Sequence, residues 1–284
     1  IAAQEVQVDF KETKLTKKLK KDLELYNDLR EKSELSIRKL SELNFFKHKQ
    51  KSLVPISADD LNSLSPVNRR YSFKLRNSYL SRIFNRTFKR GGRFYKGAET
   101  IMPLDVRKHL YIDGKPTVEY DYTATHFMML YNLKGVRLRK DPYIVAKNMS
   151  KRMRKIYKNV GFISLNAKNK VSALKALWKH FNKDENRELL PENTKEQRLH
   201  FIDSFIKHNK KIESVLYKEK CHMLMNYDSK IAHDILMHFT NKGILVLCVH
   251  DSFIIQKRYE KELLRMMKKF YKDRFGFNPK IGKK

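Results

Sequence analysis

The chain of 284 residues is 41% hydrophobic, enough to bury the core of one large domain or of a domain with an appendage. Lysine and arginine number 62 against 31 acidic residues, and the net charge of +31 predicts a polyanionic partner such as nucleic acid, unless solvated lysine-rich surfaces account for it. No apolar run approaches the roughly 18 residues of a membrane span, and no signal peptide is recognisable, which argues against a membrane protein.

Residues 1–60 are predicted to form a helical appendage and linker ahead of a core over residues 61–284. Leucines at helical spacing indicate two amphipathic helices, one around Leu15 to Leu29 and one from Leu35 to Leu43. Such helices would pack on the core or on a partner protein. Prolines and serines over residues 51–66 predict the linker.

Arginine and aromatic residues alternate over residues 69–96. Arginines contact phosphates and aromatic rings stack on bases, a combination suited to single-stranded nucleic acid. The aromatic residues also fit the buried face of a helix that Gly91 and Gly92 would end. The predicted nucleic-acid-binding residues are Arg69, Arg70, Arg76, Arg82, Arg86, Arg90 and Arg93.

An aspartate stands at a predicted junction between a strand and a helix. Residues 117–122 are β-prone and follow an Asp113-Gly114 turn signal, while Phe127 and Leu130 suit a helix. Asp121 is therefore expected where the strand ends.

A basic helical region comes next. Asp141-Pro142 is typical of a helix N-cap with proline in the first turn. Downstream, four residues spaced four apart share one face of a helix, namely Arg154, Lys158, Phe162 and Asn166. Residues 170–240 are expected to be largely helical, with Trp178 and Phe181 in the core.

The two cysteines, Cys221 and Cys248, lie in apolar surroundings without metal-ligand spacing. They indicate a reducing compartment such as the cytoplasm rather than a disulfide scaffold.

Residues 244–249 and 253–255 are apolar and flank His250-Asp251-Ser252, which predicts two buried strands joined by a tight turn. A basic amphipathic helix over residues 259–275 and a lysine-rich tail complete the chain. A carboxylate between buried strands is costly unless a cation neutralises it, although backbone amides of the turn also satisfy an aspartate.

Asp121 and Asp251, both at strand ends, can meet on neighbouring strands and hold two Mg²⁺ ions, with Mn²⁺ as an alternative. The helical row would then supply charge to a triphosphate, Arg154 through its fork and Lys158 as a point charge. Phe162 on the same face would pack on the incoming base.

In their order and spacing these motifs resemble the catalytic core of the A-family DNA polymerases. The first palm motif of that family matches Asp121-Tyr122-Thr123, its fingers motif matches Arg154, Lys158 and Phe162, and its Val-His-Asp-Glu motif matches Val249 to Ser252. The resemblance covers about residues 90–260 and implies an α+β fold: a palm with an antiparallel sheet, helical fingers, a reduced or absent thumb and the helical N-terminal appendage. It also implies that the Tyr122 carbonyl is a metal ligand beside Asp121 and Asp251.

Several positions depart from the family pattern. His126 and Asn166 replace a glutamate and a tyrosine that together exclude a ribose 2′-OH, which predicts relaxed sugar discrimination, unless His126 merely packs in the palm. Ser252 replaces an accessory glutamate. Glu119 lies on the same strand face as Asp121 and is a further candidate ligand. His250 would support the turn or contact the primer end.

In its small size and high lysine content, the chain is similar to the A-family-related primase-polymerases of staphylococcal cassette chromosome elements. This resemblance implies primase-like synthesis or extension of short primers on single-stranded DNA from NTPs or dNTPs, a small companion DNA-binding protein and a nearby replicative helicase. De novo priming and the preferred sugar stay open.

Two other function classes remain: a single-stranded nucleic-acid-binding protein without catalysis, and a metal-dependent phosphohydrolase. The second would use His250-Asp251 with His222, His233 and His238.

Overall fold

The computed structural model describes residues 9–38, 53–55, 73–75 and 79–284. They divide into two compact units. The first comprises Ile1–Tyr122, Asn226–Tyr271 and Lys280–Lys284, and the second comprises Thr123–Met225 and Lys272–Pro279. The predicted boundary at residue 60 lies outside the described residues.

An antiparallel sheet forms the frame of the first unit. Its strands run in the order β2-β3-β1-β6-β7-β9-β8, and β10 pairs with β7 beside that path. The strands are β1 (Leu35–Ile37), β2 (Leu53–Pro55), β3 (Phe73–Leu75), β6 (Leu110–Ile112), β7 (Lys115–Tyr122), β8 (Val246–Val249), β9 (Ser252–Gln256) and β10 (Ile281–Lys283). An antiparallel sheet combined with separate helices confirms the expected α+β class, and the strands predicted over 117–122 and 244–256 are present.

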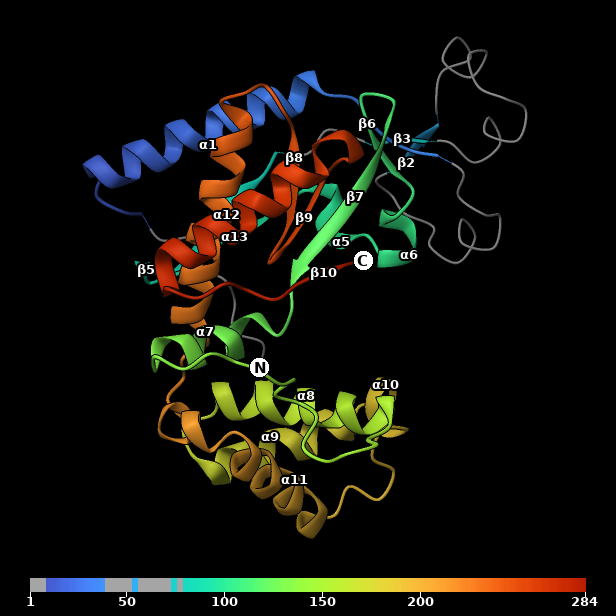
Figure 1. Ribbon diagram of the computed structural model, residues 1–284, viewed down its shortest axis with the longest axis vertical. Helices are drawn as coiled ribbons and strands as arrows, with labels where there is room; N and C mark the ends of the chain where they lie inside the picture. Colours follow the sequence, from blue (N-terminus) through green and yellow to red (C-terminus); the bar gives the residue numbers. More distant parts are fainter. Residues whose placement is uncertain (1–8, 39–52, 56–72, 76–78) are drawn as a thin grey trace. The chain divides into compact units, whose positions relative to one another are not determined.

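The two faces of β7 differ in character. Tyr120 and Tyr122 point to α13 (Glu260–Phe275), where the Tyr122 hydroxyl donates to the Met267 carbonyl at 2.7 Å. Glu119 and Asp121 alternate with these tyrosines and therefore lie on the opposite face. In Figure 1, β7 and β9 lie side by side, and β10 runs along the end of β7. Alternation thus places two acidic residues together, away from α13.

Helix α1 (Lys14–Lys32) begins at Thr13, whose hydroxyl accepts from the Thr16 amide, and it belongs to the first unit. Its buried contacts are made by Tyr26 and Arg30 rather than by Leu15 or Leu25, which are exposed. The Tyr26 hydroxyl donates to the Val246 carbonyl at 2.9 Å. The helix predicted from Leu35 is wrong at 35–37, because these residues form β1 within the sheet; Leu40 and Leu43 lie outside the described residues.

The helix predicted over 69–96 is also wrong where the chain is described. Strands β4 (Ser81–Asn85) and β5 (Thr87–Tyr95) form a separate hairpin. Gly91 and Gly92 have φ values of 72° and 92°, which glycine adopts without strain. The Gly91 carbonyl accepts from Asn226 and Ser229 of α12 (Cys221–Thr240). These glycines therefore bend a strand instead of ending a helix.

Short helical segments of the first unit are α5 (Ala98–Ile101), α6 (Leu104–Arg107) and η2 (Lys257–Tyr259). The second unit is helical throughout its regular structure, as expected. Its helices are α7 (Thr125–Leu133), α8 (Lys151–Asn166), α9 (Lys170–Phe181), α10 (Asp184–Arg187), α11 (Lys195–His208) and η1 (Lys210–Val215). Helices α8, α9 and α11 pack against one another (Figure 1).

Packing of the second unit corrects two further expectations. Phe181 is fully buried, but Trp178 is 50% exposed and is not a core residue. Asp141 caps no helix, since α8 starts only at Lys151, with Ser150 as its N-cap. A methyl group at Gly161 would come within 2.7 Å of the Phe205 ring, so glycine lets α8 approach α11 closely.

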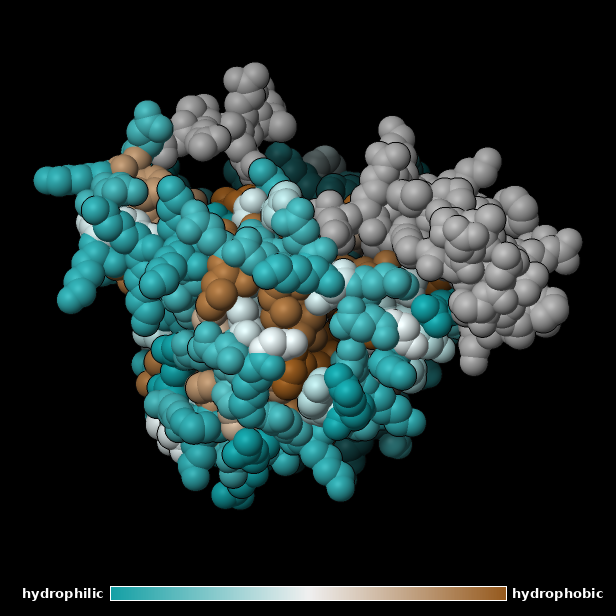
Figure 2. Space-filling view, turned by 90° about the horizontal axis from the view of Figure 1, so that it is seen from above, coloured by the Kyte–Doolittle hydropathy of each residue, from teal (hydrophilic) through white to brown (hydrophobic). Residues whose placement is uncertain are grey.

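Hydrophilic side chains cover most of the face seen in Figure 2, around a smaller group of apolar residues. This distribution agrees with the high charge of the chain. Among the described residues, no helix has both the length and the apolar character needed to span a bilayer. Neither Cys221 nor Cys248 forms a disulfide, and Cys248 is buried.

Candidate active site

Strands β7 and β9 bring the two predicted catalytic aspartates to the same end of the sheet. Asp121 is paired across the ladder with Ser252, the residue after Asp251. The Tyr122 amide donates to the Asp251 carbonyl at 3.2 Å. Only His250 and Asp251 separate β8 from β9, and the positive φ of 60° at His250 permits this tight turn. Both aspartates are half-buried.

Burial and three charged neighbours all affect the ionisation of the Asp121 carboxyl group. Burial raises the pKa of its carboxyl group, Lys284 opposes this shift, and Asp251 and Glu119 add to it. The Lys284 ammonium forms an ion pair with Asp121 Oδ2. Because nearby negative charges disfavour the ionised carboxylate, the end of β7 attracts cations.

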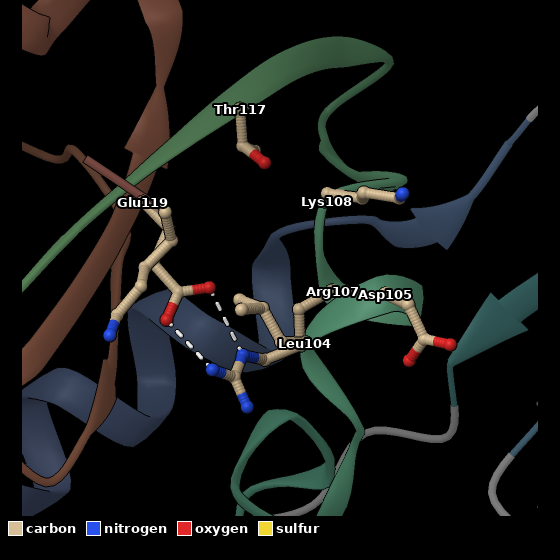
Figure 3. A pocket seen from close by; sticks show the side chains of 7 residues that line it. Leu104, Asp105, Arg107, Lys108, Thr117 and Glu119 are labelled. Atoms are coloured by element: carbon tan, nitrogen blue, oxygen red, sulfur yellow. Dashed lines mark hydrogen bonds and ion pairs between the residues drawn. The ribbon is translucent and has the colours of Figure 1, made fainter. Parts of the chain in front are cut away.

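Glu119 belongs to a buried network beside this pair. Its carboxylate accepts from Arg107 Nη2 at 2.8 Å and Nε at 3.1 Å, and from Ser252 Oγ at 2.6 Å. Figure 3 shows the two Arg107 contacts at a pocket of about 460 Å³ that Glu119 lines. These contacts satisfy Glu119 and compete with its use as a metal ligand. The Ser252 hydrogen bond also orients the Glu119 carboxylate.

His250 sits inside the turn rather than in solvent. Its ring makes an edge contact with Tyr95, with centroids 5.6 Å apart, and its carbonyl accepts from Cys248 Sγ at 3.4 Å. Burial lowers the pKa of His250, and the nearby Arg93 lowers it further. The His250 ring is therefore packed at the turn, and its support of the turn stays a prediction.

The triphosphate-binding row predicted on the second unit lies on α8, as the spacing required. Arg154 binds Asp141 Oδ2 through Nη2 at 2.7 Å and Nε at 2.9 Å, and its guanidinium lies over the Tyr143 ring. Lys158 is exposed and Phe162 is 53% exposed. A phenyl ring this open on a helix is available for stacking.

The two residues of the predicted sugar pocket, Asn166 and His126, also lie in the second unit. Asn166 ends α8 and donates to the Phe162 carbonyl at 3.0 Å. His126 lies half-buried in the first turn of α7. Asp121 and Asp251 thus belong to the first unit, and the residues predicted to contact the nucleotide belong to the second.

The predicted nucleic-acid-binding arginines fall into three groups. Arg69, Arg70 and Arg76 lie outside the described residues. Arg82 donates to the Gly92 carbonyl at 2.9 Å, and burial lowers its pKa to about 10. Arg93 Nε lies 3.1 Å from Asp228 Oδ2. Arg86 and Arg90 are exposed on the β4–β5 hairpin, so they are the described arginines best placed for phosphate contact.

Four residues near the aspartates were not predicted: Tyr95, Arg107, Asp228 and Lys284. Arg107 and Asp228 each form an ion pair with a partner at least 12 positions away in the sequence, so no local pattern marks them. Lys284 was regarded only as part of a basic tail. The sequence from Ile281 to Lys284 is compatible with a short strand, but nothing in it identifies β7 as the partner.

The donor set fits a hard divalent cation. Two carboxylates and a main-chain carbonyl are oxygen ligands of the kind that Mg²⁺ prefers. Within the described ranges no group of three or more His, Cys, Asp or Glu side chains is arranged to hold a metal ion. His233 pairs with Asp22 and His238 with Glu262, which gives a phosphohydrolase cluster no support.

No family model matches this chain, and no curated protein matches its sequence. Among solved structures it is similar to the POL domain of Pol1 from M. smegmatis, determined in complex with DNA primer-template and dNTP. The sequences are 11% identical and the TM-score is 0.45. The match covers 79% of this chain and 49% of the other, so this chain spans about half the length of that protein.

Proposed function

We propose that the chain is a template-directed nucleotidyltransferase that synthesises or extends short primers on single-stranded DNA. The observation that carries the proposal is the meeting of Asp121 and Asp251 at one end of the β7–β9 pair. Two carboxylates at one end of a strand pair are the kind of ligands that two-metal phosphoryl transfer uses. The resemblance of the surrounding motifs to A-family polymerases supports the same reaction.

Asp121, Asp251 and the Tyr122 carbonyl would hold two Mg²⁺ or Mn²⁺ ions. When bound, such ions activate the attacking hydroxyl and stabilise the leaving pyrophosphate. Arg107 and Ser252 hold Glu119 beside the aspartates, where it would order the site without coordinating a metal directly.

The α8 row would hold the nucleotide. Lys158 offers an unhindered ammonium to the phosphates, and Phe162 offers its open ring to the base. Arg154 would share its guanidinium between Asp141 and a phosphate, since a guanidinium has five N–H donors. His126 and Asn166 would contact the sugar.

The primase-like part of the proposal rests on sequence resemblance and charge. The net charge of +31 favours binding of a nucleic-acid backbone, and Arg86 and Arg90 are exposed for it. A small companion DNA-binding protein and a replicative helicase are the partners that the resemblance implies.

The test is synthesis on single-stranded template with labelled rNTPs or dNTPs and Mg²⁺ or Mn²⁺, with and without a primer. Products without primer would establish priming, and products only with primer would restrict the function to extension. DNA binding without product under either condition would contradict the proposal and favour a non-catalytic single-strand-binding protein.

The exposed α8 row makes a specific prediction. Lys158→Ala and Phe162→Ala are expected to raise the KM for nucleotide by roughly tenfold each, the effect of losing about 1.4 kcal/mol of binding. Both variants should keep their melting temperature, because these side chains are exposed. Lys155→Ala, an exposed lysine of the same helix outside the row, is the matched control and should leave KM unchanged.

Sugar selection gives a second prediction. His126→Glu is expected to lower incorporation of rNTPs relative to dNTPs by about tenfold, because the glutamate side chain would occupy the space that a ribose 2′-OH needs. Single-nucleotide incorporation with matched rNTP and dNTP measures the ratio. An unchanged ratio in an active variant would remove His126 from the sugar pocket.

A further inference from the structure

The end of the chain forms a strand against the candidate metal site. Strand β10 pairs with β7 in the register Ile281 to Tyr122, Gly282 to Asp121 and Lys283 to Tyr120. The Lys284 amide continues the ladder by donating to the Glu119 carbonyl at 3.0 Å. The main chain of the tail is therefore held directly beside Asp121.

The alternation of β10 sends its two lysines to opposite faces. The Lys283 ammonium binds Glu260 Oε1 at 3.0 Å and lies over the Tyr120 ring, on the α13 face. The Lys284 ammonium lies on the carboxylate face, where it pairs with Asp121 and lines the same pocket as Arg107 and Glu119. Only the second lysine reaches the candidate catalytic carboxylates.

The Lys284–Asp121 pair is sheltered. Its side chains are only 34% and 20% exposed, so water screens the pair less than it would screen a surface pair. A lysine ammonium that close supplies the positive charge that this carboxylate lacks. An ammonium and a divalent cation on one carboxylate oxygen would repel each other, and the repulsion is strong in a partly buried site.

We propose that Lys284 is a built-in competitor for the metal, so that β10 acts as an autoinhibitory strap on the active site. The inference rests on the proposed function, because it assumes that Asp121 is a metal ligand. Metal binding then requires the Lys284 side chain to leave Asp121, while the main-chain pairing of β10 can remain. Metal binding at Asp121 would favour the arrangement in which the Lys284 side chain has left this carboxylate.

The test measures Mn²⁺ binding to the full chain by the electron paramagnetic resonance signal of free Mn²⁺, without nucleotide. Lys284→Gln, which keeps length and removes charge, is expected to lower the Kd by about three- to tenfold. Lys283→Gln is the matched control, because its ammonium lies on the other face, and its Kd should equal that of the wild type. Equal Kd values for Lys284→Gln and wild type would overturn the proposal.

Asp121→Asn separates this inference from the proposed function. If Asp121→Asn weakens Mn²⁺ binding and Lys284→Gln has no effect, only the strap is overturned. If Asp121→Asn leaves binding unchanged, Asp121 is not a ligand and both are overturned.

Discussion

Asp251→Asn is expected to lower the rate of nucleotide incorporation by at least about 10³-fold, because metal ligation supplies several kcal/mol of transition-state stabilisation. Asparagine keeps the size of the side chain and one oxygen acceptor but removes the charge that a divalent ion needs. Asp121→Asn should have an effect of the same order, since the two residues share one end of the β7–β9 pair.

Both variants should remain folded. The Asp121 pair with Lys284 is partly buried, so its loss is expected to cost more than the loss of a surface pair but less than the roughly 3–5 kcal/mol of a fully buried one. Thermal unfolding monitored by circular dichroism, alongside primer extension under saturating nucleotide, measures the two effects separately.

A surface aspartate provides the control. Asp203 forms an exposed ion pair with Lys170 on the second unit, and Asp203→Asn should retain the wild-type rate. Incorporation by Asp251→Asn at more than about a tenth of the wild-type rate would contradict a ligand role for this residue.

Local patterns were sufficient where one period dominates the segment. Apolar runs on either side of His250-Asp251-Ser252 predicted β8, β9 and their turn, and the four-residue spacing from Arg154 predicted the exposed row of α8. Each of these segments buries one consistent set of side chains, so tertiary packing reinforces the local preference.

The failures occurred where distant partners decide the structure. Leu35 and Ile37 fit a helix by spacing, yet β1 is completed by β3 and β6, which come from elsewhere in the chain. The tail offered no apolar period, and β10 forms because β6 pairs only with Lys115 and Pro116 of β7, which leaves residues 120–122 of that strand for β10. Asp141 looked like a cap but is held by Arg154, a partner that a cap pattern does not reveal.

The same limit applies to the site. The two aspartates could be found from strand ends, but the network that surrounds them could not. The sheet brings Arg107 to Glu119 and Lys284 to Asp121. Long-range ion pairs carry no periodic signature, so the electrostatics of this site became visible only with its geometry.

Arg30→Met is expected to destabilise the chain by about 3–5 kcal/mol, because it leaves a buried carboxylate without its partner. Arg30 on α1 donates to both oxygens of Glu99 on α5, at 3.1 and 2.6 Å, and the two side chains are 1% and 0% exposed. Chemical denaturation of the variant measures the loss. Lys17→Met, which removes an exposed pair with Glu12, is the control and should cost less than about 1 kcal/mol.

The double variant Arg30→Met/Glu99→Leu is expected to recover most of that loss, since two apolar side chains avoid the desolvation cost of both charges. Recovery would show that the ion pair adds little net stability and serves mainly to specify how α1 packs in the first unit. The packing of α1 would then depend on Tyr26, whose hydroxyl still reaches the Val246 carbonyl of β8. Because β8 leads into the His250-Asp251 turn, loss of α1 packing should also lower nucleotide incorporation by Arg30→Met near its melting temperature. A wild-type free energy of unfolding for Arg30→Met would contradict the buried pair.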